Sequence, residues 1–112
     1  MAGVCLLITS SPMSPEGRQA LELAEAFVNT NDALTICALQ DAVFLACQKQ
    51  PRESLHAMER LLARGATLCV LHEDLALRGL ASAELLDPVT RVDYRKIVEL
   101  LAGDRVQVIG CM

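Results

Sequence analysis

Three polar residues, His72, Glu73 and Asp74, directly follow an unbroken apolar run over residues 68–71. A run of this kind is typical of a strand that is buried on both faces, as the strands of parallel sheets are. The leucines after Asp74 show no strand-like alternation, so they predict a helix whose first turn carries the two acids. Ligands of open α/β folds bind at the carboxyl ends of the strands. His72, Glu73 and Asp74 are therefore candidate residues of a substrate or partner site.

A similar pattern occurs earlier in the chain. Residues 33–39 predict a second buried strand, and Gln40 and Asp41 come at its carboxyl end. Asp41 is placed to cap a following helix over residues 42–49. Because the carboxyl ends of parallel strands meet at one edge of a sheet, Asp41 is a further candidate for the same site.

The five cysteines offer nucleophilic chemistry, because a thiolate attacks sulfur and carbonyl centres readily. Their number is odd, and they show neither a C-x-x-C pair nor metal-ligand spacing. We therefore expect free thiols in a reducing compartment, and no metal site. Cys5, Cys37 and Cys69 lie inside apolar strands and are expected to pack in the core.

Cys47 and Cys111 remain as candidate catalytic nucleophiles. Cys47 falls on the apolar stripe of the helix predicted after Asp41, so core packing is its main alternative role, while Lys49 could lower its pKa in an exposed position. Cys111 is the penultimate residue and is expected on a mobile chain end, where its thiol could reach a partner. No basic residue stands near Cys111 to activate it, so an unreactive tail thiol is the alternative.

The composition excludes several classes of protein. The 112 residues are 53% hydrophobic and 3% aromatic, a high apolar content that suggests burial of some surface against another subunit. The net charge of −4, with scattered lysines and arginines, argues against direct nucleic-acid binding. No apolar run approaches the roughly 20 residues of a membrane helix, and no secretory signal is recognisable. We therefore expect a cytoplasmic protein. Glycine-rich phosphate signatures are absent, and no cofactor is expected.

The remaining segments continue the alternation of strands and helices. Residues 3–9 predict the first strand, and Ser14 with Pro15 predicts the start of a helix that ends near Asn29. Residues 52–64 predict a helix that Gly65 caps, residues 85–86 a short strand, and residues 105–109 the last strand. The helix predicted over residues 93–102 has an apolar face made of Tyr94, Ile97, Val98 and Leu101. The pattern predicts one domain over residues 1–112, a three-layer α/β/α sandwich with a mainly parallel five-stranded sheet.

Three stretches resemble the DsrE/DsrF/DsrH superfamily, which includes the sulfur-relay subunits TusB, TusC and TusD. They are DALTICALQDAVFLACQKQ at residues 32–50, MERLLARGATLCVLHEDLALRGL at residues 58–80 and VDYRKIVELLAGDRVQVIG at residues 92–110. The residues after the second and third predicted strands are most similar to the TusB/DsrH branch. The resemblance implies an oligomeric α/β protein of a pathway that passes sulfane sulfur as a cysteine persulfide.

The resemblance also locates the acceptor cysteine of the active branch, just after the third predicted strand. Its place falls on Leu71 here, and that of a second cysteine found in some relatives falls on Asp74. Neither residue can carry sulfur. This departure is similar to the TusB and TusC type of subunit, which lacks the acceptor.

Three hypotheses for the function follow. The first is a subunit of a cytoplasmic sulfur-relay or sulfur-oxidation complex, in which Asp41, His72 and Glu73 line a partner's persulfide site. Its partners would be further copies or DsrE/DsrF-like paralogues, with a sulfur-carrier protein as another candidate. The second is a sulfurtransferase that carries a persulfide on Cys47 or Cys111. The third is a homo-oligomeric module that binds a small molecule or regulates a partner.

Overall fold

The computed structural model describes residues 3–30, 33–103 and 106–111. Its sheet has five strands in the order β4-β3-β2-β1-β5, and every neighbouring pair is parallel. The strands are β1 (Gly3–Ile8), β2 (Ala33–Ala38), β3 (Thr67–Leu71), β4 (Thr90–Val92) and β5 (Val106–Cys111). The predicted α/β class and five-stranded sheet are confirmed, and the sheet is wholly parallel.

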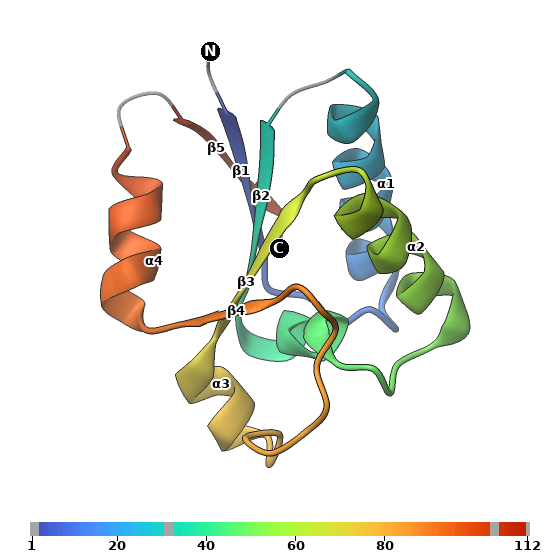
Figure 1. The fold of residues 1–112 in the computed structure, drawn as a ribbon, viewed down its shortest axis with the longest axis vertical. Helices are drawn as coiled ribbons and strands as arrows, with labels where there is room; N and C mark the ends of the chain where they lie inside the picture. The colour runs from blue at the N-terminus through green and yellow to red at the C-terminus, as the bar shows by residue number, and fades with distance from the viewer. Residues whose placement is uncertain (1–2, 31–32, 104–105, 112) are drawn as a thin grey trace.

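The helices lie on both faces of this sheet and at its carboxyl edge. They are α1 (Pro15–Asn29), the 3₁₀ helix η1 (Gln40–Ala46), α2 (Arg52–Ala63), α3 (His72–Leu77) and α4 (Tyr94–Leu101). Figure 1 shows α1 and α2 on one side of the sheet, α4 alone on the other, and α3 beyond the ends of the strands. This arrangement is the expected three-layer sandwich, with unequal outer layers.

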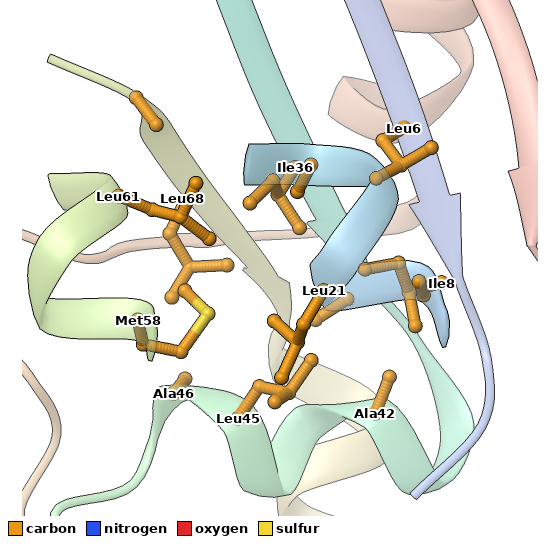
Figure 2. Close-up of a cluster of buried hydrophobic side chains, with 14 of the residues drawn as sticks. Leu6, Ile8, Leu21, Ile36, Ala42, Leu45, Ala46, Met58, Leu61 and Leu68 are labelled. Atoms are coloured by element: carbon orange, nitrogen blue, oxygen red, sulfur yellow. The ribbon is translucent and has the colours of Figure 1, made fainter. Parts of the chain in front are cut away.

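The larger core lies between the sheet and the layer formed by α1, α2 and η1. Alternate strand residues such as Leu6, Ile36 and Leu68 point into it and meet Leu21 of α1 and Met58 of α2 (Figure 2). These side chains are at most 5% exposed. The inward-facing side chains of the strands, which alternate along each strand, thus pack against the apolar faces of the helices in one aliphatic layer. This layer supplies most of the hydrophobic stabilisation.

The start of α1 is set by a local network. The Ser14 hydroxyl accepts a hydrogen bond from the Gly17 amide at 3.0 Å, and Pro15 occupies the first turn, as predicted. Gly17 lies so close to the Ser11 carbonyl that an added Cβ would overlap that oxygen. A glycine is therefore required here by space.

The sequence prediction was wrong in two segments, residues 85–86 and residues 42–49. Residues 85–86 form no strand of the sheet: Leu85 makes an isolated antiparallel bridge with Cys47, and Leu86 donates to the Ala46 carbonyl at 2.8 Å. The fourth strand is Thr90–Val92 instead, paired with the end of β3. The helix predicted over residues 42–49 is the 3₁₀ helix Gln40–Ala46, which has no side-chain cap, so Asp41 does not serve as its N-cap.

Two predictions about the C-terminal region were also wrong. In α4, Ile97 is buried, but Tyr94 is 56% and Val98 63% exposed, because the helix presents a narrower face to the sheet than its apolar residues cover. The last strand continues to Cys111, which pairs with Ile8 of β1. Cys111 is therefore part of the sheet, and not of a mobile tail. Across the described ranges, no helix is long and apolar enough to cross a membrane.

The close approach at Gly17 gives the first prediction. Gly17→Ala should lower the free energy of unfolding by about 1–3 kcal/mol, because its methyl group cannot be placed without moving the Ser11 carbonyl. Thermal or urea unfolding measures this difference. Gln19→Ala, an exposed change in the same helix, should leave stability nearly unaltered. Equal stabilities for the two variants would contradict the packing described here.

Candidate functional site

The carboxylate of Asp74 is buried at the carboxyl edge of the sheet. Asp74 is 5% exposed, and its Oδ2 accepts a hydrogen bond of 2.6 Å from the backbone amide of Gln40. A buried carboxylate is costly unless it is hydrogen-bonded or paired with a cation. The bond ties the first turn of α3 to the end of β2, although the two residues are 34 positions apart.

Gln40 holds an unusual backbone conformation at this point. Its φ of +52° is the only positive value among the described residues other than glycine. The left-handed region costs an L-residue about 1–2 kcal/mol, so surrounding contacts must hold it there. The charge-assisted bond to Asp74 is such a contact. The turn after β2 is therefore fixed by α3.

Arg78 joins two of the three predicted acids of the site, Asp41 and Asp74. Its Nε donates to Asp41 Oδ1 at 3.0 Å, and its Nη1 donates to the Asp74 carbonyl at 3.3 Å and lies 3.7 Å from Asp74 Oδ1. The Arg78 side chain is 24% exposed and that of Asp41 62% exposed. The cluster thus presents one guanidinium and one carboxylate to solvent beside a second, buried carboxylate.

Arg78 was not predicted as a site residue, although one sequence signal pointed to it. It follows Asp74 by four positions on a predicted helix, the spacing at which side chains meet on one face. Gln40 gave no such signal, because its role depends on a contact between distant parts of the chain.

Glu73 stands apart from this cluster. Its Oε2 is buried without a hydrogen-bond partner, and no other buried side-chain oxygen or nitrogen in the described part of the chain is in that state. Leaving a buried acceptor unpaired costs about 1–3 kcal/mol. A donor group supplied from outside the chain would relieve this cost.

His72 lies on the side of the sheet that α4 covers. It is exposed and lines a shallow hollow of about 510 Å³ together with residues from β4 and the start of α4. Among these, Lys96 adds a positive charge and Asp93 caps α4 through the Lys96 amide at 2.9 Å. The four predicted residues thus share one edge of the sheet, but His72 lines this hollow, whereas Asp41 and Asp74 meet at Arg78.

The position at which the family resemblance places an acceptor cysteine is filled by apolar packing. Leu71 is the last residue of β3 and is fully buried beside Val92 and Ile97. Neither a thiol nor solvent access exists there. Asp74, at the second position, is occupied by its bonds to Gln40 and Arg78.

Three thiols form a buried row under α4. Cys37 pairs in register with Cys69, and the Cys37 and Cys5 Sγ atoms are 3.5 Å apart. The hydrogen bond from the Cys37 thiol lowers the pKa of Cys5, whereas the same bond and burial raise the pKa of Cys37. Burial also raises the pKa of Cys69, against a smaller effect of Lys96. All three are at most 5% exposed, as expected for core residues.

The two candidate nucleophiles differ in access. Cys47 ends η1, is 3% exposed, and points its thiol toward the Val43 carbonyl at 3.8 Å. Burial raises its pKa, and the opposing effect of Arg91 is smaller. Cys111 is half-buried at the end of β5, and burial raises its pKa as well. No group of three or more potential metal ligands occurs in the described ranges.

Comparison with solved structures shows the same fold in two proteins of low sequence identity. The crystal structure of the ychN protein from E. coli superimposes with a TM-score of 0.84 at 20% identity, covering 97% of this chain and 100% of that one. A protein of unknown function from Methanobacterium thermoautotrophicum, MTH1491, gives a TM-score of 0.77 at 17% identity, with 98% and 99% covered. These likenesses show the fold.

Comparison of the sequence itself shows the family. No curated protein sequence matches the chain. The profile of the family described as DsrH like protein matches residues 13–107, which include every element from α1 to α4. The chain therefore belongs to the DsrH-like protein family.

Proposed function

We propose that this chain is a non-catalytic subunit of a cytoplasmic sulfur-relay or sulfur-oxidation complex, of the kind that serves tRNA thiolation. The observation that carries the proposal is Leu71, a fully buried side chain without sulfur at the family's acceptor position. The chain would complete a persulfide-transfer site whose acceptor cysteine belongs to a DsrE- or DsrF-like paralogue.

The charged cluster at the carboxyl edge suits this supporting role. A deprotonated persulfide is an anion, and the Arg78 guanidinium offers fixed donors at the edge of the cluster. Asp41 and Asp74 orient that guanidinium, and the Asp74 bond fixes the loop that carries Asp41. Glu73 adds an acceptor that a partner's donor group could satisfy. His72 would extend the contact toward α4.

Binding of the paralogue tests the role of this edge. Asp41→Ala should weaken the complex with a cysteine-bearing paralogue about 10-fold, because the freed Arg78 loses its orientation at the interface. Its thermal stability should change little, since the Asp41 side chain is 62% exposed. Isothermal titration calorimetry measures the affinity.

Glu59→Ala is the matched control, because Glu59 is an exposed acid on α2. That variant should bind the paralogue as tightly as the wild type. Equal affinities for the Asp41 and Glu59 variants would show that the Asp41 edge is not the contact.

The isolated chain gives a second test. After incubation with a low-molecular-weight persulfide donor, intact-mass spectrometry should show no stable gain of sulfur, because the acceptor position holds Leu71 and four of the five thiols are buried. A cysteine-bearing paralogue treated in parallel is the positive control. A sulfur adduct that one Cys→Ser change abolishes would contradict the proposal.

Sulfur transfer through Cys111 is the second candidate function, and one observation favours it. Cys111 is half-buried, whereas the other four cysteines are buried. Its position on β5 also places it at the same carboxyl edge as the end of β1. Cys47, the other predicted nucleophile, is buried and its thiol is not accessible to solvent.

Thiol alkylation under native conditions measures this access. Cys111 should react first, and Cys111→Ser should remove the fast phase. Because burial raises its pKa, its thiolate fraction should be below that of an unperturbed cysteine at neutral pH and should increase as the pH rises through its folded-state pKa. A fast phase that persists in Cys111→Ser would assign the reactive thiol elsewhere.

A further inference from the structure

A groove between α1 and α2 is separate from the carboxyl-edge site. The two helices lie side by side on one face of the sheet, and both begin at its carboxyl edge (Figure 1). The groove has a volume of about 420 Å³. Sites for small molecules have volumes of about 300–1,000 Å³. The groove shares no lining residue with the Asp41–Arg78–Asp74 cluster or with the hollow beside His72.

The inner surface of the groove is largely apolar. Leu21 of α1 is 5% exposed and Ala57 of α2 is 7% exposed, and Pro12 is buried as well. Met13 also lines the groove and is 75% exposed. A methionine side chain is flexible and polarisable, so it adapts to apolar groups of different shape. The groove therefore offers apolar contact to the body of a ligand.

Both ends of the groove are held by hydrogen bonds. At the start of α1, the Ser14 amide and hydroxyl both donate to the Ser11 carbonyl, at 3.0 and 2.7 Å, and so close the loop that carries Met13. In the third turn of the helices, Arg60 Nη2 donates to Glu25 Oε1 at 2.7 Å and joins α2 to α1. Binding to a preformed site requires less ordering of the protein, which favours affinity.

The rim of the groove has charges of both signs that the chain leaves unpaired. Arg18 and Glu22 lie four residues apart on α1, and Glu53 lies in the first turn of α2. These three side chains are exposed, and none makes a hydrogen bond or ion pair with another described residue. The rim therefore presents one guanidinium and two carboxylates. A ligand that pairs with both kinds of group must be a zwitterion.

We propose that this groove binds a zwitterionic dipeptide with apolar side chains. Its carboxylate pairs with Arg18, its ammonium group pairs with Glu22 and Glu53, and its side chains contact Leu21 and Ala57. Residues four apart on a helix have Cβ atoms about 5–6 Å apart. Two residues of extended chain span at most about 7 Å, so the termini of a dipeptide match the spacing of Arg18 and Glu22. This site does not depend on the proposed relay role.

Titration of the full chain with L-leucyl-L-leucine, followed by amide proton–nitrogen correlation NMR, tests the groove. Signals of residues 18–25 and 53–57 should shift together and fit one site. The dissociation constant should be roughly 0.1–1 mM, as expected from the binding energy per atom of small ligands. N-acetyl-leucyl-leucine and leucyl-leucine amide each lack one charge and should bind about 10-fold more weakly. Glycylglycine keeps both charges but buries no apolar side chain, so it should also bind about 10-fold more weakly.

Substitutions on α1 separate this site from general surface binding. Arg18→Gln and Glu22→Gln should each weaken L-leucyl-L-leucine binding about 10-fold, because each removes one charged partner of the ligand. Glu16→Gln is the matched control, since Glu16 is an exposed acid on the same helix that does not line the groove. This variant should bind as tightly as the wild type. Circular dichroism should show that all three variants are folded, because the changed side chains are exposed.

Four outcomes would overturn the proposal. They are the lack of a saturable shift within the solubility of L-leucyl-L-leucine, shifts confined to residues away from the groove, equal affinities for the charged and blocked dipeptides, and equal affinities of the Arg18 and Glu16 variants.

Discussion

A wholly parallel sheet must be buried on both faces, and the rest of this structure depends on how the chain meets that constraint. The strands therefore have apolar residues on both sides, which explains the row of cysteines under α4 as well as the aliphatic layer under α1 and α2. Three helical elements cover one face and a single helix the other. The same imbalance leaves Tyr94 and Val98 of α4 exposed.

The carboxyl edge is organised by one buried acid. Asp74 holds Gln40 in a left-handed conformation and supports Arg78, so α3 and the turn after β2 form one rigid unit. A sulfur carrier would instead need an accessible thiol at this edge, with a cation nearby to stabilise the thiolate. The chain has a cation at this edge, Arg78, but the position at which the family resemblance places the thiol is occupied by Leu71. This geometry supports our proposal of a subunit that shapes a site for another protein's nucleophile.

Much of the fold could be predicted because its signals are local. The apolar runs of β1, β2 and β3 and the Ser14-Pro15 start of α1 follow from short-range physics. β4 was missed because three residues with an exposed arginine carry no strand pattern, whereas the Leu85–Leu86 pair packs against the core from an irregular segment. The Asp74 bond to Gln40 was not predictable, since it joins residues that only the finished fold brings together.

In the proposed role, this chain supports sulfur transfer without carrying the sulfur. The most direct test is intact-mass analysis, chain by chain, of its reconstituted complex with a cysteine-bearing paralogue after exposure to a persulfide donor. Within the complex, we expect a sulfur adduct on the paralogue and none on this chain. The adduct should form faster than on the isolated paralogue. An adduct on this chain that transfers onward to the paralogue would contradict the proposed role.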